Sequence, residues 1–165
     1  MYRKILVPLD GSELAERVLP HATALAKGTG AEVTLATVVQ LTLGAIGGKL
    51  EAIPEAAAER RTALKAEAMI YLEMVQRDLK NKGVTAHIVA LEGDVAREII
   101  TYAEQEGFDL VTMATHGRSG IDRFVMGSIA EKVIRSTVKP VLLIRALPVV
   151  PRQVDWQQIT VPPAP

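Results

Sequence analysis

The segment 111–128 carries glycines and a serine at spacings that could bind an anion. Its apolar first residues are typical of a strand end, and the loop that follows contains Gly117 and Gly120. Gly127 and Ser128 come directly before a helical pattern, where unpaired backbone N–H groups and the positive end of the helix dipole attract anions. Ser128 can cap this helix or bond a phosphate oxygen. The sequence predicts a phosphate site here, although a turn and a helix cap would explain the same glycines without a ligand.

Two well-known loops are excluded by the same residues. A P-loop needs a Lys and a Ser or Thr directly after its second glycine. A hydrolase nucleophile elbow needs glycine two places before and two places after its serine, whereas Ser119 has Gly117 two places before it and Ile121 two places after it. With no activated nucleophile and no carboxylate cluster in view, binding is expected rather than catalysis.

A second group of polar residues follows the apolar run at residues 4–9, which is typical of a strand buried on both faces of a parallel sheet. Asp10 could hydrogen-bond a ribose hydroxyl or help to hold a divalent ion. As a turn residue, Asp10 would instead bond its own backbone. Ser12 is predicted to cap the next helix.

Strand and helix patterns alternate along the rest of the chain. Apolar runs predict four more strands, at 32–39, 84–91, 109–114 and 141–144. Helical periods predict four helices, which run from Ser12 to Gly28 or Gly30, from about 54 to 82, from Gly93 or Asp94 to Gly107, and from 128 to about 137.

This alternation predicts an α/β fold with a five-stranded parallel sheet and helices on both faces. Right-handed crossovers leave few arrangements, of which we expect strand order 3-2-1-4-5. The order reverses between the first and fourth strands, and ligands bind in the crevice beyond the strand ends at such a point. The loops at 8–11 and 115–118 would flank that crevice.

Two segments fit neither pattern. Residues 40–53 contain three glycines and no clear period, which favours either a lid or a disordered linker. Residues 147–165 form a Pro-rich tail, in which Trp156 and its apolar neighbours could dock on the domain. We therefore expect one domain at residues 1–146, followed by the tail.

The glycine spacing resembles the universal stress protein family, whose members carry Gly-x2-Gly-x9-Gly-Ser/Thr after the fourth strand. Ala114, Gly117, Gly127 and Ser128 occupy these positions here, so Ala114 replaces the first glycine. The resemblance covers about residues 1–146, from KILVPLDGS to KPVLLIR.

The resemblance implies a cytoplasmic homodimer with a Rossmann-like, adenine nucleotide alpha hydrolase-like fold that binds ATP, with Mg²⁺ on the phosphates. The backbone of Val38 would read the adenine edge, and Met113 would lie under the nucleotide. Arg118 and Arg123 could pair with phosphate or remain solvated. The implied nucleotide-binding residues are Pro8, Leu9, Asp10, Val38, Met113, Ala114, His116, Gly117, Arg118, Gly127, Ser128, Ile129 and Ala130.

The last predicted strand closes one edge of the sheet. An exposed apolar edge is an aggregation hazard, which pairing with a twofold copy would remove. Family members dimerise in this way. The expected homodimer contact is Val141, Leu142, Leu143 and Ile144.

The amino-acid composition limits the classes of partner and metal site that this chain can have. The 165 residues have a formal net charge of zero, which does not suggest nucleic acid binding, and no cysteine, which excludes disulfides and thiolate metal sites. The chain shows no signal peptide pattern and no apolar run long enough for a bilayer, so a cytoplasmic location without membrane contact is expected. His87 lies in a predicted strand with no partner in view, and a metal role is not expected for it.

Two other functions remain open. Ala114 favours a member of the same fold that binds no nucleotide and acts through protein contacts. An adenylate-forming enzyme would need a second substrate pocket, for which the 40–53 segment is the available wall. Slow ATP hydrolysis is also open, with Mg²⁺ on the phosphates.

Overall fold

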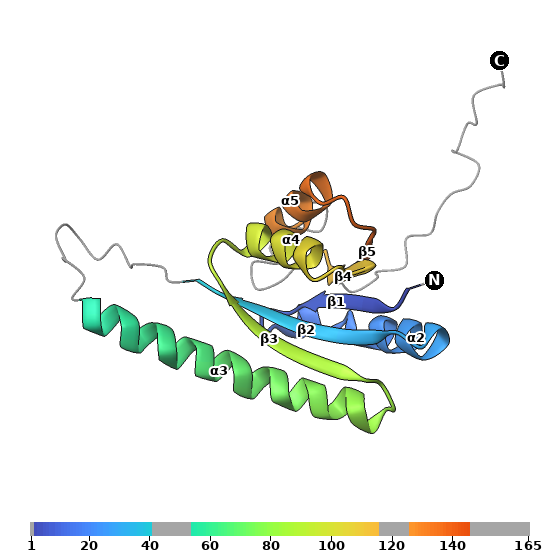
Figure 1. The fold of residues 1–165 in the computed structure, drawn as a ribbon, viewed down its shortest axis with the longest axis horizontal. Helices are drawn as coiled ribbons and strands as arrows, with labels where there is room; N and C mark the ends of the chain where they lie inside the picture. The colour runs from blue at the N-terminus through green and yellow to red at the C-terminus, as the bar shows by residue number, and fades with distance from the viewer. Residues whose placement is uncertain (1, 41–53, 116–125, 146–165) are drawn as a thin grey trace, which may run out of the picture.

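The computed structural model describes residues 2–40, 54–115 and 126–145. Its five strands form one parallel sheet in the order β3-β2-β1-β4-β5 (Figure 1), as the sequence predicts. The strands are β1 (Lys4–Pro8), β2 (Glu32–Val39), β3 (Ala86–Glu92), β4 (Leu110–Ala114) and β5 (Val141–Ile144).

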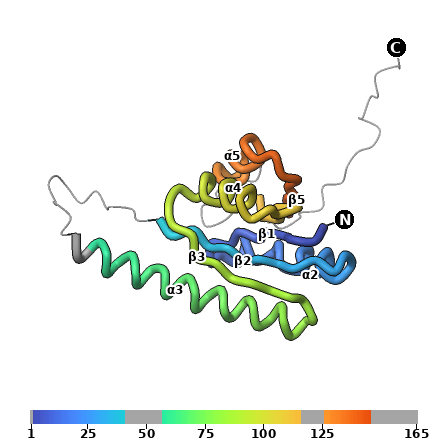
Figure 2. Tube along the Cα trace, viewed as in Figure 1, coloured from blue at the N-terminus to red at the C-terminus, as the bar shows by residue number. Residues whose placement is uncertain are grey.

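Helices cover both faces of the sheet. The helices are α1 (Glu13–Glu16), α2 (Leu19–Thr29), α3 (Pro54–Asn81), α4 (Val95–Gln105) and α5 (Ser128–Ser136). In Figures 1 and 2, α2 and α3 lie on one side, and α4 and α5 lie on the other. Neighbouring residues of β1 point to opposite faces. Ile5 and Val7 therefore pack in the core that includes α2 and α3, and Leu6 packs in the core that includes α4 and α5.

The single helix predicted after β1 is divided in the structure into α1 and α2, which are separated at residues 17–18. Pro20 is the second residue of α2, and it has no N–H to bond the carbonyl of Glu16, which its ring also crowds. Gly28 lies inside α2 instead of ending it. The helix ends at Gly30, whose φ of 73° suits glycine.

The strand predicted at 84–91 begins two residues later, at Ala86. Val84 still belongs to the turn that leaves α3, because its N–H donates to the carbonyl of Leu79 at 3.0 Å. Gly83 has a φ of 79°, which matches its predicted place just beyond the end of α3.

None of the helices in the described part of the chain combines the length and apolar character that a membrane span requires.

Candidate functional site

β1 and β4 lie side by side in the middle of the sheet, with Ile5 opposite Leu110 and Leu6 opposite Val111. Both strands run in the same direction, so their carboxyl ends lie at the same end of the sheet. The chain leaves β1 towards α1 and α2 on one face, and β4 is followed by α5 on the other face. This is the switch point predicted from the sequence, and such a divergence leaves a crevice for ligands.

The turn after β1 is held by a short network of hydrogen bonds. The N–H of Leu9 donates to the carbonyl of Ala36 at 2.8 Å, and Oγ1 of Thr37 donates to the carbonyl of Leu9 at 3.0 Å. Oδ1 of Asp10 accepts from the backbone N–H of Ser12 at 3.0 Å and from its hydroxyl at 2.6 Å. Asp10 therefore makes the local turn contact that the sequence suggested, and this contact fixes its carboxylate just beyond β1.

Ser12 couples that turn to the next helix. Its hydroxyl accepts from the N–H of Ala15 at 3.1 Å while donating to Asp10, so the predicted cap is confirmed. The two-residue spacing from Asp10 to Ser12 is that of an Asx turn, so this link belongs to the turn that the sequence suggested for Asp10.

The base of the loop after β4 is closed by backbone hydrogen bonds. Met113 and Ala114 are buried, with 5% and 7% of their surfaces exposed. The N–H of Thr115 donates to the carbonyl of Ile144 at 2.9 Å, and the N–H of Gly127 donates to the carbonyl of Thr115 at 2.8 Å. The start of α5 is thereby fastened to the end of β4. No residue type indicated this role for Thr115.

Gly127, and not Ser128, is the N-cap of α5. Ser128 is already the first helical residue, and it is exposed. This corrects the expectation that its hydroxyl caps the helix. Because glycine has no side chain, this cap supplies no acceptor to the first amides of the helix, those of Ser128, Ile129 and Ala130. Those amides suit an anion.

The remaining predicted residues fall into two groups. Pro8 and Val38 lie at or next to the last residues of β1 and β2, both half-buried, so the structure brings them to the same end of the sheet as Asp10. His116, Gly117 and Arg118 lie outside the described residues, as do Gly120, Arg123, the 40–53 segment beyond Gln40 and the tail.

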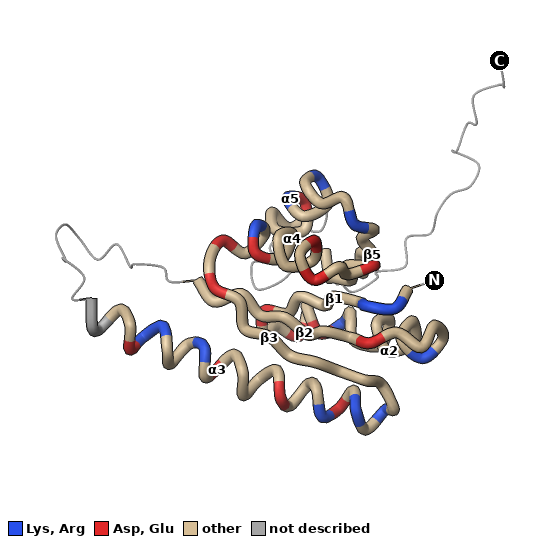
Figure 3. Tube along the Cα trace, in the orientation of Figure 1, with Lys and Arg blue, Asp and Glu red and all other residues tan. Residues whose placement is uncertain are grey.

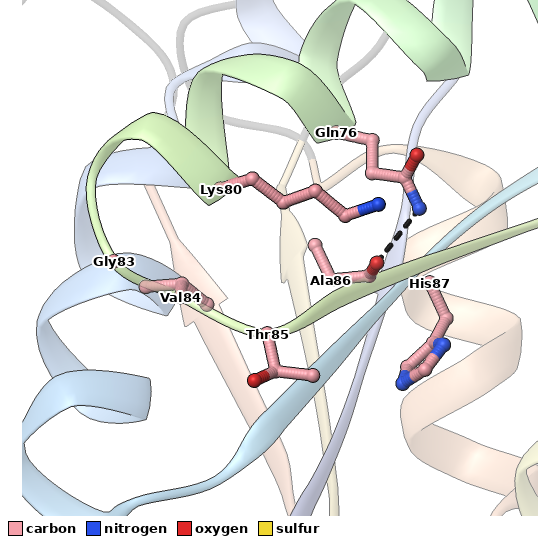
Figure 4. Close-up of a pocket in the computed structure, with 7 residues that line it drawn as sticks. All are labelled: Gln76, Lys80, Gly83, Val84, Thr85, Ala86 and His87. Atoms are coloured by element: carbon pink, nitrogen blue, oxygen red, sulfur yellow. Dashed lines mark hydrogen bonds between the residues drawn. The ribbon is translucent and has the colours of Figure 1, made fainter.

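Two surface depressions lie at the opposite, amino ends of the strands. The larger, of about 430 Å³, is drawn in Figure 4 and is lined by Gln76, Lys80, Gly83, Val84, Thr85, Ala86 and His87. The smaller, of about 240 Å³, is lined by Lys4, Glu32, Thr34, His87, Ile88, Tyr102, Glu106 and Phe108.

His87 has a partner at this end, contrary to the expectation, because its Nε2 lies 3.3 Å from Oε2 of Glu32. Within the described ranges, no group of three or more His, Asp and Glu side chains could hold a metal ion.

Within the described residues, the groups with shifted pKa values also lie at the amino ends of the strands. The backbone N–H groups of Arg3 and Lys4 donate to Oδ2 of Asp109 at 2.8 and 3.0 Å, and they hold the pKa of this carboxyl below its usual value. Burial, aided by the nearby charge of Glu106, raises the pKa of Tyr102. Asp109 ties the start of β4 to β1, and both groups lie far along the strands from Asp10.

Comparison with known proteins decides the family. The model of the universal stress protein family matches residues 1–145. The chain belongs to this family. Universal stress protein MJ0531 of Methanocaldococcus jannaschii is 36% identical over 145 residues, which cover 88% of this chain and 83% of that protein.

Solved structures of the family share the fold. The structure of MJ0577, from the same organism, has a TM-score of 0.80 and 31% identity, and the match covers 90% of this chain and 99% of that one. A universal stress protein from Archaeoglobus fulgidus, solved in complex with dAMP, has a TM-score of 0.56 and 22% identity over 87% of this chain and 98% of that one.

Proposed function

We propose that this universal stress protein binds ATP as a homodimer and acts as a nucleotide-dependent module in stress response. The observation that carries the proposal is the pairing of β1 with β4, which puts the Asp10 turn at the same end of the sheet as a helix that begins with a glycine cap. A carboxylate suits ribose hydroxyls, and free helix amides suit phosphates.

Each part of the nucleotide has a matching group in this proposal. Ile129 and Ala130 offer backbone N–H groups to the phosphates, and the exposed hydroxyl of Ser128 adds a donor. The backbone of Val38 faces the adenine, and Met113 forms the floor. The A. fulgidus relative supports the choice of ligand, because dAMP shares the adenine base and a phosphate with ATP.

The loop residues His116, Gly117 and Arg118 complete the proposed set by their likeness to the family motif. Mg²⁺ would bind to the phosphates rather than to a protein cage, since the described residues hold no cluster of metal ligands.

Replacement of Gly127 tests the proposal. Its φ of −58° accepts any residue, so Gly127→Val leaves the backbone unstrained but sets a branched side chain beside the helix amides. Calorimetric titration should show that the wild-type protein binds MgATP and that this variant binds at least about tenfold more weakly, a loss of ~1.4 kcal/mol.

Gly28→Val is the matched control, because Gly28 is an exposed helical glycine with open space around its α-carbon. It should leave ATP binding unchanged. Equal ATP affinity in wild type and Gly127→Val would contradict the proposed site.

The proposed homodimer uses the free edge of β5. Leu142 and Ile144 direct their backbone groups towards β4, as the bonds from Val111 to the Pro140 carbonyl and from Thr115 to the Ile144 carbonyl require. Val141 and Leu143 therefore direct theirs outwards. Such a row of outward groups suits pairing with a twofold copy.

Leu143→Pro removes one outward N–H without removing a bond to β4. Light scattering should show the loss of this dimer contact, whereas Leu142→Pro should unfold the strand. A wild-type-like assembly in Leu143→Pro would contradict pairing through β5.

A second function, protein interaction without a nucleotide, is favoured by Ala114, which stands buried where the family motif has its first glycine. The wild-type titration separates the two functions. An intact dimer that takes up no ATP would support the second.

A further inference from the structure

Two large apolar side chains on α3 point away from the sheet. Ile70 is 62% exposed and Met74 is 59% exposed. Leu72 and Leu79 are fully buried on the same helix. At 3.6 residues per turn, both lie about 180–200° around the helix from Ile70. The Ile70 side chain therefore lies on the face of α3 opposite the core, and not at the edge of the core.

The rotation of α3 is fixed on both flanks. The Tyr71 hydroxyl donates to Oε1 of Glu16 at 3.0 Å, and Nε2 of Gln76 donates to the carbonyl of Ala86 at 2.7 Å. These bonds join α3 to α1 on one side and to β3 on the other. The helix cannot turn Ile70 inwards without breaking them.

The exposed apolar surface continues along the helix as a stripe formed by Ala63, Ala66, Ile70 and Met74. Their spacings of three and four residues place them on one face, and all four are exposed. At 28 residues, α3 is about 42 Å long. Because β3 is much shorter, the helix extends past the sheet (Figure 1), so the stripe is accessible. The side chains in the first half of the stripe, Ala63 and Ala66, are small, and those in the second half, Ile70 and Met74, are large.

The ends of the stripe carry opposite charges. Glu59 and Arg77 are both exposed and share the sector of Ile70, because eleven and seven residues are close to whole numbers of turns. Charges of both signs lie along α3 in Figure 3. An antiparallel copy of the helix, with a twofold axis beside position 68, brings each Glu59 to the Arg77 of the other copy. It also sets each Ala66 against the Ile70 of the other copy.

Other arrangements of two copies are disfavoured by charge. Parallel helices would set Glu59 against Glu59. An antiparallel pair with its axis beside Ile70 would bring Glu67 of one copy to Glu73 of the other. Like charges held together in this way are destabilising.

We propose that two copies of this chain associate through the α3 stripe as an antiparallel, twofold pair. The large half of each stripe packs on the small half of the other, and the two Glu59–Arg77 pairs close the ends. This surface lies at the opposite edge of the sheet from β5. A chain with two such self-complementary surfaces assembles into a closed tetramer or a linear array.

The first test compares masses by sedimentation equilibrium over a concentration series. Ile70→Arg should lower the mass of the assembly, from four chains to two if it is a closed tetramer and from many chains to two if it is a linear array. Val138→Arg is the matched control, because Val138 is 84% exposed at the α5–β5 turn, and it should leave the mass unchanged. Equal masses for wild type and Ile70→Arg at every concentration would overturn the proposal.

The second test reverses the charges. Glu59→Arg and Arg77→Glu should each weaken the association, and the double variant should restore it. Failure of the double variant to recover would overturn the antiparallel arrangement. The same series in a Leu143→Pro background reports on α3 alone, so the outcome does not depend on whether β5 forms a dimer.

Discussion

At the amino ends of β1 and β4, side chains bond the two strands directly to each other, whereas the described hydrogen bonds at their carboxyl ends hold the turns that follow the strands. Asp109 accepts two N–H bonds from β1 and its preceding residue, and Nζ of Lys4 donates to the Glu106 carbonyl at 2.6 Å while lying 5.1 Å from the centre of the Phe108 ring. The other end depends on the Thr115–Gly127 bond and a glycine cap.

This difference indicates that the two ends of the strands have different roles. Side-chain contacts at the amino end fix the register of the two strands. At the carboxyl end, the Asp10 carboxylate and the first amides of α5 are the groups that the proposed site would offer to a ligand.

The largest effect should follow from Asp10→Ala. The change removes a charged hydrogen-bonding partner, worth about 1.5–3 kcal/mol, so ATP binding should weaken by about one to two orders of magnitude. Calorimetric titration measures the loss. Asp109→Ala, at the other end of the same strands, is the control, and equal losses in both variants would abolish the contrast between the ends.

Thr112 lies between the two ends, in the middle of β4. Its side chain is fully buried, and Oγ1 has no hydrogen-bonding partner within the described part of the chain. Thr112→Val keeps the shape and removes the unsatisfied hydroxyl, so it should raise the free energy of unfolding by about 1 kcal/mol in urea titrations.

Thr37→Val makes the same chemical change where the hydroxyl donates to the Leu9 carbonyl, so it should destabilise instead. Opposite signs for the two valine variants are the expected result. Destabilisation by both would mean that the Thr112 hydroxyl is satisfied.

Ala114→Gly restores the first glycine of the family motif. Unfolding should become easier by about 0.5–1 kcal/mol, because glycine weakens a strand. Without the methyl group the nucleotide can come closer, so ATP affinity should rise, by no more than about tenfold. An unchanged dissociation constant would show that the Ala114 methyl does not contact the ligand.

The smallest effect concerns the amino end and depends on pH. Folding lowers the pKa of Asp109 from its ordinary value of 3.8, so its ionised form stabilises the native state above that value. This contribution is lost as the pH falls through the lowered pKa. Asp109→Ala should therefore lower the urea midpoint at pH 7, and the difference from wild type should shrink on acidification below the ordinary value. A difference in urea midpoint between wild type and Asp109→Ala that stays constant on acidification would show that it does not arise from the ionised Asp109 carboxylate.

The sequence predicted a large part of the fold because its signals are local. Continuous apolar runs marked five strands, and Ser12 and Asp94 marked helix starts that the structure confirms. Handedness rules left few strand orders, and the order expected among them is confirmed; it brings the Asp10 turn and the α5 start to one end of the sheet. The missed break between α1 and α2 was also a local signal, since Pro20 is visible in the sequence.

The amino acid sequence by itself determined the elements, their order and the residue types offered at the switch point. The tertiary structure decided which atoms meet: Gly127 caps α5 while bonded to Thr115, Asp109 bonds backbone groups more than a hundred positions away, and Ile70 remains outside the core. Periodicity and capping act within a few residues. Contacts between distant segments form when the sheet is assembled, and so they leave no regular spacing in the chain.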